Sequence, residues 1–339
     1  MFTELTINNF KNFKHLEVKD IKLVNTISGF NQSGKTTFLE AIACIGGLYL
    51  PHLLYQKNLN WRDFDIRSAD EVLYLFHNLQ DANNPISLTA TYDNIQRIIN
   101  VKLIRQEPLC SLSFEHHLGK KMMVSNVQLS LQPQASGSYW INNHTFDEST
   151  LAHNIPCRLV NNNTAKIDHT FCVSKLLSDA KREELLSFLN NVLNDKIKDI
   201  FINYRCEVHV LKNNVAKSIP TSLLGDGFKK IAALFSMFFT GDKVILIDEI
   251  ENGLHHSLHK KVIASIFKYA HKKHIQVFIA THNQEILTTI NEVLTEHQEY
   301  QQDYSHYMLA NTTKGNKAYR LNHEELDSTL ASTFDVRDK

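Results

Sequence analysis

One short stretch near the start of the chain has the residue types and the spacing to bind the phosphates of a nucleotide. The sequence GFNQSGKTT fits the pattern G-x-x-x-x-G-K-[ST]. Its glycines let backbone N–H groups face phosphate oxygens, and a following helix adds its positive end. The lysine supplies charge for the β- and γ-phosphates, and the threonine hydroxyl can ligate Mg²⁺. We therefore predict ATP and Mg²⁺ as ligands, bound by Gly29, Asn31, Gln32, Ser33, Gly34, Lys35, Thr36 and Thr37.

Two acidic residues follow a strongly apolar run in the segment KVILIDEIENGLHHS. Val244 to Ile247 read as a buried strand that delivers Asp248 and Glu249 to its carboxyl end, where α/β sheets bind ligands. We predict that Asp248 joins Thr36 as a metal ligand and that Glu249 activates the attacking water. Two carboxylates at this place can also simply cap the strand.

The next apolar strand, IQVFIATH, ends in Thr281 and His282. A histidine at the end of a strand can hydrogen-bond a γ-phosphate, or it can cap the helix that follows. The order of the three motifs along the chain favours a catalytic role for His282.

A glycine-rich segment, SLLGDGFKK, lies just before the acidic strand. Such a turn exposes N–H groups and the positive end of the helix that it opens. The residues are compatible with half of an anion site shared with another chain. A plain turn that only caps a helix is the alternative.

The elements that must position these motifs form an α/β pattern. We expect strands at 4–10 and 22–30, and a helix from about Lys35 to Leu50. Five short stretches between 87 and 146 read as antiparallel strands, and 70–79 as helix or loop. The second half predicts a parallel sheet with alternating helices and strands. Its expected elements are helix 178–194, strands 198–204 and 206–214, helix 228–239, strand 243–250, helix 255–271 and strand 275–282.

The composition is that of an ordinary globular protein, and its net charge would not attract a polyanion such as DNA. The 339 residues include 36 basic and 36 acidic side chains, so the formal net charge is zero. Five scattered cysteines without a C-x-x-C pair indicate reduced thiols rather than a disulfide framework or zinc site. No signal peptide and no run of 18 apolar residues is found, so we expect a cytoplasmic protein without a membrane partner.

The order of the motifs resembles that of the ABC-type ATPases. More narrowly, the chain is similar to the OLD family and its stand-alone AAA-type relatives, which are related to RecF, SMC and MutS. DEIENGLHHSLHKK resembles the family's DEIENGLHP, with His256 in place of proline, and ATHNQEIL resembles TTHSPEIL. LTINNFKNFK resembles the opening strand, whose NFKNF part lies near the nucleotide, so the resemblance adds Lys11 and Asn12 to the binding residues. It covers about 1–50 and 160–339.

This resemblance implies a fold and an assembly. The expected fold is an α/β ABC-type ATPase head with a mixed or parallel sheet core, an antiparallel β lobe and a helical signature lobe. We expect one head, built from 1–50, a β-rich or irregular insertion at 51–160, and 161–339. In the family, nucleotide is sandwiched between two heads. The residues that would contact nucleotide held by the neighbouring subunit are Ser222, Gly225, Asp226 and Gly227.

Family resemblance also suggests what the head acts on. Only 57 residues follow His282, so we expect no Toprim or other nuclease domain, and the DFD at 63–65 is interpreted as surface. Long coiled-coil arms are absent, which excludes a full SMC or RecN. Relatives in the PARIS and Septu antiphage systems act with a Toprim and an HNH nuclease respectively.

We therefore expect an antiviral-defence ATPase that forms a homodimer or a higher even oligomer. It would control a separate nuclease effector, with DNA or a phage protein as the trigger. The resemblance assigns the loop at 251–253 to communication across the dimer. The alternatives are a RecF-like DNA-repair ATPase that clamps DNA when ATP-bound, and a nucleotide-locked scaffold with negligible turnover.

Overall fold

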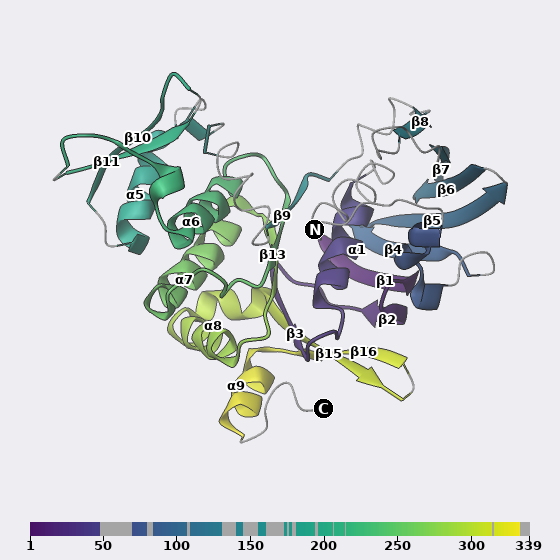
Figure 1. Ribbon diagram of the computed structural model, residues 1–339. Helices are drawn as coiled ribbons and strands as arrows, with labels where there is room; N and C mark the ends of the chain where they lie inside the picture. Colours follow the sequence, from purple (N-terminus) through teal and green to yellow (C-terminus); the bar gives the residue numbers. More distant parts are fainter. Residues whose placement is uncertain are drawn as a thin grey trace.

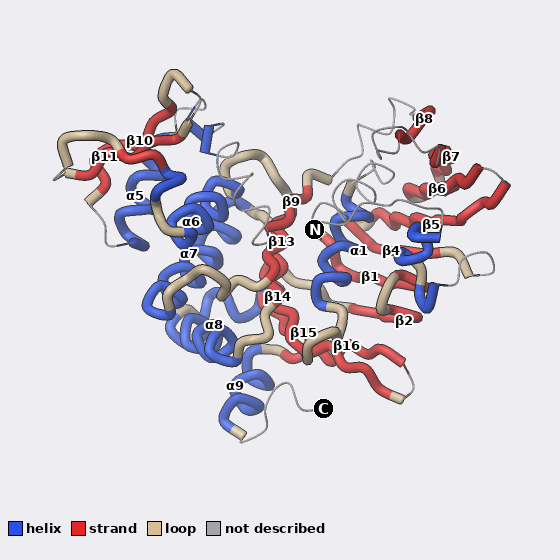
Figure 2. The backbone as a smooth tube through the Cα atoms, in the orientation of Figure 1, coloured by secondary structure: helices blue, strands red, loops and turns tan. Residues whose placement is uncertain are grey.

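Two large sheets enclose one central helix, and further helices cover the far side of one sheet (Figures 1 and 2). The structure is a computed structural model. It describes residues 1–47, 70–79, 84–106, 109–130, 140–144, 155–160, 173–174, 176–177, 181–193, 196–205, 207–213, 215–313 and 315–332. The DFD at 63–65 lies outside these ranges.

The central sheet carries the predicted nucleotide motifs. Its five neighbouring strands from β15 to β9 run parallel, and β16 pairs antiparallel at one edge. β3, β13 and β14 are buried along their whole length, as expected for parallel strands covered on both faces. The spatial order is β16 (Gly315–Leu321), β15 (Tyr304–Thr312), β3 (Val24–Gly29), β14 (Gln276–Ala280), β13 (Val244–Asp248) and β9 (Cys157–Val160).

The second sheet is antiparallel throughout, as the short alternating stretches predicted. Its strands after residue 84 extend the sheet begun by β1 and β2, so they are not separate from the N-terminal part. Residues 70–79 form two short 3₁₀ helices, η2 (Asp70–Leu75) and η3 (His77–Leu79). The spatial order is β2 (Phe13–Val18), β1 (Phe2–Phe10), β4 (Ile86–Tyr92), β5 (Ile95–Gln106), β6 (Leu109–Leu118), β7 (Lys121–Ser130) and β8 (Trp140–His144).

The predicted phosphate-binding segment that starts at Gly29 is called the P-loop below. Helix α1 (Lys35–Gly46) begins at its end and lies between the two sheets (Figure 1). Every residue from Thr37 to Gly46 is buried, which explains why the helix is almost entirely apolar. It ends earlier than the predicted Leu50, because Gly47 takes an extended conformation. The Gly47 N–H donates the last hydrogen bond of the helix, to the Ala43 carbonyl oxygen. Residues 48–50 lie outside the described ranges.

The helical lobe packs on the opposite face of the central sheet (Figure 2). Aromatic rings fill its centre: Phe188 stacks on Phe235 at 3.6 Å between centroids, and Tyr269 meets Phe235 edge-on. Three of its helices begin and end within a few residues of their predicted bounds: α5 (Arg182–Leu193), α6 (Asp226–Met237) and α7 (His256–Lys273). The bounds of α8 (Gln284–Glu296) were not predicted. Beside these helices lies a small sheet of β10 (Ile197–Ile202), β11 (Val208–Lys212) and β12 (Ile219–Pro220).

The C-terminal residues complete the central sheet. Strand β15 pairs in parallel with β3, and α9 (His323–Ala331) follows the β15–β16 hairpin. Between β3 and β15, the buried imidazole of His306 lies 2.7 Å from the Thr26 hydroxyl and 2.9 Å from that of Ser28. This polar contact ties the strand before the P-loop to its neighbour.

Candidate nucleotide-binding site

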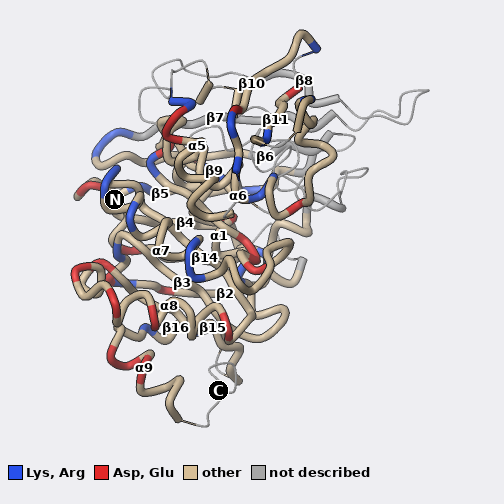
Figure 3. Tube along the Cα trace, turned by 90° about the vertical axis from the view of Figure 1, so that its left-hand side faces the viewer, with Lys and Arg blue, Asp and Glu red and all other residues tan. Residues whose placement is uncertain are grey.

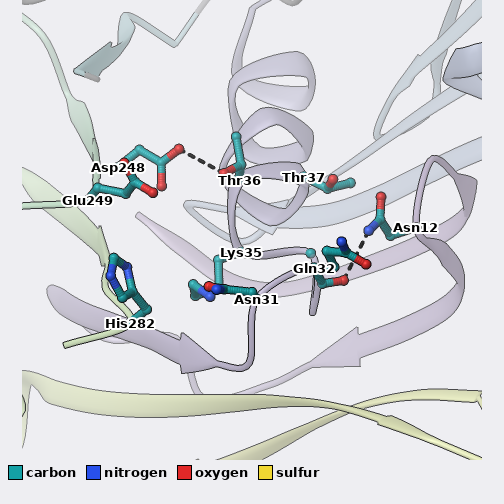
Figure 4. A pocket seen from close by; sticks show the side chains of 10 residues that line it. Asn12, Asn31, Gln32, Lys35, Thr36, Thr37, Asp248, Glu249 and His282 are labelled. Atoms are coloured by element: carbon teal, nitrogen blue, oxygen red, sulfur yellow. Dashed lines mark hydrogen bonds between the residues drawn. The ribbon is translucent and has the colours of Figure 1, made fainter. Parts of the chain in front are cut away.

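The three predicted motifs meet in one pocket of about 230 Å³ at the carboxyl ends of β3, β13 and β14 (Figure 4). The turn between β1 and β2 closes one side of it. The lining residues are Asn12, Asn31, Gln32, Gly34, Lys35, Thr36, Thr37, Asp248, Glu249 and His282.

Two glycines of the P-loop are required by geometry. Gly29 has φ +143°, and a Cβ there would lie 2.4 Å from the carbonyl oxygen of Leu309. Gly34 has φ +98°, and a Cβ there would lie 2.5 Å from the ring of Phe13, the first residue of β2. Because both conformations and both spaces exclude a side chain, the curled backbone depends on these glycines.

The loop is arranged to receive an anion. The Lys35 Nζ donates to the Gly29 and Phe30 carbonyl oxygens at 2.8 and 3.0 Å, so the ammonium group crosses the loop. Burial lowers the pKa of Lys35, while Asp248 and Glu249 oppose that shift. Within the described ranges, the buried Ser33 hydroxyl has no hydrogen-bond partner. A free buried hydroxyl and a desolvated cation fit a phosphate group.

Thr36 and Asp248 form the candidate metal position. The Thr36 hydroxyl donates to Asp248 Oδ2 at 2.8 Å (Figure 4). Burial raises the pKa of Asp248 to about 6, and the Thr36 hydrogen bond only partly opposes this. A hydroxyl and a carboxylate are the hard oxygen ligands that Mg²⁺ prefers, with phosphates and waters completing its shell. The residues therefore fit the predicted metal.

Glu249 opens a strained turn. Its φ is +50°, a left-handed conformation that costs a non-glycine residue about 1–2 kcal/mol. The Asn252 N–H closes the turn on the Glu249 carbonyl at 3.1 Å, and the Asn252 side-chain amide donates to the Glu249 carboxylate. Backbone strain is thus located at the residue predicted to activate water.

Lys230 is a site residue that the sequence reasoning missed. The residue is 3% exposed, and its Nζ donates to the carbonyl oxygens of Glu249 and Asn252 at 2.7 and 2.8 Å. Burial lowers the pKa of Lys230 to about 8, with Glu251 as the main opposing charge. The sequence does contain a signal for this role: Lys230 precedes Ile231 on the apolar face of α6, and a buried charge there needs a polar partner.

The glycine-rich segment lies at the start of α6 and does not line the pocket of its own chain. Ser222, Gly225 and Asp226 are exposed. A Cβ on Gly225 would meet nothing within 4 Å, whereas one on Gly227 would lie 2.8 Å from the Gly253 carbonyl oxygen. Gly225 is therefore open to a second molecule, and Gly227 packs against its own chain.

The β1–β2 turn separates two residues that were predicted together. Asn12 lines the pocket, and its side-chain amide donates to the Gln32 carbonyl at 3.2 Å (Figure 4). Lys11 is not among the lining residues. It forms an ion pair of 2.7 Å with Glu40 of α1, whose side chain is fully buried. Lys11 thus fixes the turn on α1, and its predicted contact with nucleotide stays untested.

Comparison with known proteins supports the assignment of the fold. The family model "AAA domain, putative AbiEii toxin, Type IV TA system" matches residues 133–288. The chain is 26% identical to the "ATP/GTP phosphatase" of Helicobacter pylori over 344 residues, covering 90% of both proteins. It is 57% identical to the DNA replication and repair protein RecF of Nitrosococcus oceani over 44 residues, 13% of this chain and 12% of RecF.

A solved SMC head, bound to the C-winged helix domain of ScpA, has a TM-score of 0.54 with this structure. The match covers 96% of this chain and 99% of the SMC head, at 13% sequence identity. The mixed central sheet, the antiparallel lobe and the helical lobe that were predicted are thereby confirmed. The chain has the fold of an SMC/ABC-type ATPase head.

Proposed function

We propose that the protein binds ATP with Mg²⁺ and hydrolyses it to ADP and phosphate. The observation that carries this proposal is the pocket itself. It joins the P-loop, the Thr36–Asp248 pair, Glu249 and His282 on three adjacent strand ends. The similarity to a protein named as an ATP/GTP phosphatase supports the same activity.

The proposed chemistry divides among the lining residues. Lys35 and the P-loop N–H groups hold the β- and γ-phosphates, and Thr36 and Asp248 would hold Mg²⁺. Bound there, the metal ion would supply positive charge to the phosphate oxygens. Glu249 accepts a proton from the water that attacks the γ-phosphorus, and the bond to the β–γ bridging oxygen breaks as ADP leaves. His282 hydrogen-bonds the γ-phosphate oxygens.

A second copy of the head completes the site in this proposal. Ser222, Gly225 and Asp226 are exposed and lie outside the pocket of their own chain, so they are free to contact nucleotide held by a neighbour. A head-to-tail homodimer, or a higher even oligomer, then holds two nucleotides between its subunits.

The biological role that we propose is control of a separate effector in a prokaryotic antiviral defence system. The head would act in the cytoplasm on a nuclease of the Toprim or HNH type, triggered by DNA or a phage protein. The family model's description names a toxin of a toxin–antitoxin system, and the similar SMC head binds a protein domain. Both observations favour a head that works through a protein partner.

No described helix is both long enough and apolar enough to cross a membrane.

A RecF-like DNA clamp is the second candidate, favoured by the 44-residue match to RecF. Figure 3 shows Lys and Arg positions interspersed with Asp and Glu positions along the described chain. A clamp should bind naked duplex DNA in the presence of ATP, with an affinity that falls steeply as salt rises. An effector-controlling head should instead co-purify with the product of a neighbouring gene.

Two substitutions test the proposed reaction. Lys35→Ala should abolish ATP binding, because it deletes the main cation facing the phosphates. Glu249→Gln should retain ATP binding but lower turnover by about 100-fold or more, because the general base is lost. Exposed Lys14 and Glu285 provide matched controls, Lys14→Ala and Glu285→Gln, with unchanged activity. Normal turnover in Glu249→Gln would contradict the role of Glu249, and a wild type without turnover would favour the locked scaffold.

A further inference from the structure

The carboxylate of Glu251 is buried against the end of β14, beside the pocket. Its side chain is 8% exposed, so it needs hydrogen-bond donors to offset the loss of water. The Thr281 hydroxyl donates to Oε2 at 2.9 Å, and the backbone N–H of His282 donates to Oε1 at 3.3 Å. The His282 Nδ1 lies 3.1 Å from the same Oε1.

This contact decides which ring nitrogen of His282 faces the nucleotide. A carboxylate only accepts hydrogen bonds, so a hydrogen bond across this 3.1 Å contact requires the hydrogen on Nδ1. The other nitrogen, Nε2, is then directed away from Glu251. The His282 side chain remains 44% exposed and lines the pocket, where its ring faces Glu249 and Lys35 (Figure 4).

The same turn also holds the proposed base. Glu249 and Glu251 belong to one turn, which Asn252 closes and which Lys230 anchors through two carbonyl oxygens. Any shift of this turn therefore moves the Glu249 carboxylate and the partner of His282 together. The geometry couples the two groups that the proposed reaction needs: the base Glu249 and the γ-phosphate hydrogen-bond partner His282.

We propose that Glu251 is a positioning residue: it fixes the tautomer and orientation of His282 so that Nε2 meets the γ-phosphate end of the pocket. This inference rests on the proposed ATPase function for its kinetic consequence. It differs from a loop that only communicates between subunits, because Glu251 acts on the histidine of its own chain. A purely structural carboxylate that only supports Thr281 is the competing explanation.

A kinetic cycle separates these explanations. Glutamine is unsuitable here, because its amide oxygen can take the place of Oε1 while its NH₂ group donates to the Thr281 hydroxyl. Glu251→Leu removes both carboxylate oxygens and keeps a side chain of similar size. It should lower kcat about 10–100-fold, the usual loss for a group that orients a reacting residue, and leave the ATP dissociation constant within about twofold. In a His282→Ala background the same substitution should have no further effect on kcat, because Glu251 acts through the ring. A full multiplicative loss in the double variant would overturn the proposal.

Tautomer measurement tests the inference without any turnover. In mildly alkaline buffer, long-range ¹H–¹⁵N spectra of the nucleotide-free protein should show His282 protonated at Nδ1. The assignment comes from the signal lost in His282→Ala. In Glu251→Leu the ring has lost its acceptor at Nδ1 and should carry its hydrogen mainly on Nε2, whereas the Glu285→Leu control should leave it at Nδ1. An unchanged tautomer in Glu251→Leu refutes the proposal. Absence of ATP hydrolysis in wild type refutes only the proposed function.

Discussion

At the scale of single residues, the buried carboxylate of Asp248, a proposed metal ligand, lowers the stability of the folded protein when no nucleotide or metal is bound. Burial raises its pKa to about 6, with Glu249 and Glu40 adding to the shift. The folded state therefore binds the proton more tightly than the unfolded chain, in which the aspartate keeps its ordinary pKa of 3.8. Stability falls as pH rises from about 4 to about 6, and the full penalty remains at neutral pH.

Asp248→Asn should consequently stabilise the nucleotide-free protein at neutral pH. A shift of about two pKa units corresponds to roughly 3 kcal/mol, or a rise of several degrees in Tm. The advantage should shrink as pH falls from about 6 to about 4, because the wild-type carboxyl is then protonated. Thermal melts of both proteins across this pH range provide the measurement. The same variant should lose Mg²⁺-dependent turnover.

A wild type that is more stable than Asp248→Asn at neutral pH would contradict this argument. It would mean that the charged carboxylate makes favourable contacts that outweigh its burial.

At the scale of elements, α6 is linked directly to the turn after β13. Lys230 donates to two carbonyl oxygens of that turn, and Gly227 packs on the Gly253 carbonyl. Each head thus joins the helix proposed to contact a partner's nucleotide to its own proposed base. A displacement of α6 is transmitted through these contacts to Glu249.

Lys230→Met tests this link. Loss of both hydrogen bonds should loosen the turn and lower kcat about 10–100-fold while ATP affinity stays within about twofold. The fold should survive, because the substitution also removes the cost of burying an ammonium group. Lys268→Met is the matched control, since Lys268 is exposed on α7 and lies outside the pocket. Equal losses of kcat in both variants would indicate a general effect of charge.

Sequence patterns predicted most of the elements near the site but not all of its contacts. The P-loop, the acidic strand and His282 were predicted because phosphate and metal chemistry restricts residue type and spacing. Strand β2 was missed, although its Phe13 ring explains why Gly34 has no side chain. The β15–β16 hairpin was missed too, and its pairing with β3 joins residues far apart in the chain. The buried contacts of Lys230 and the ion pair of Lys11 with Glu40 were not predicted, because burial and ion pairing depend on tertiary packing.

At the scale of the whole molecule, the proposed sandwich requires that the start of α6 reaches a neighbouring pocket. Gly225 has φ −57° and open space around it, so a larger side chain there should leave the isolated head unchanged. Gly227 is a poor test position, because any side chain there meets the Gly253 carbonyl of the same chain.

Gly225→Gln should therefore keep ATP binding and the wild-type Tm, but lose ATP-dependent dimerisation and turnover. Mixing it with Lys35→Ala should restore up to about half of the activity per site in mixed dimers, because one composite site then carries neither lesion. Size-exclusion chromatography with ATP and a turnover assay of the mixture provide the measurements. Gly227→Ala should instead lower the Tm of the head itself.

Wild-type dimerisation and turnover in Gly225→Gln would show that the segment acts only as a helix-capping turn. A mixture that dimerises without recovered activity would show that neither site hydrolyses ATP unless both sites are intact.

The position of β3 between β14 and β15 has a consequence for the nascent chain. The P-loop strand ends at residue 29, but its two neighbours begin about 250 and 280 residues later. At translation rates of about 5–20 residues per second, the strand waits for tens of seconds before either partner exists. Pairing over such separations is slow, and an unpaired apolar strand is prone to aggregate. A translation product that stops before β14 therefore carries the phosphate-binding sequence without the sheet that shapes it.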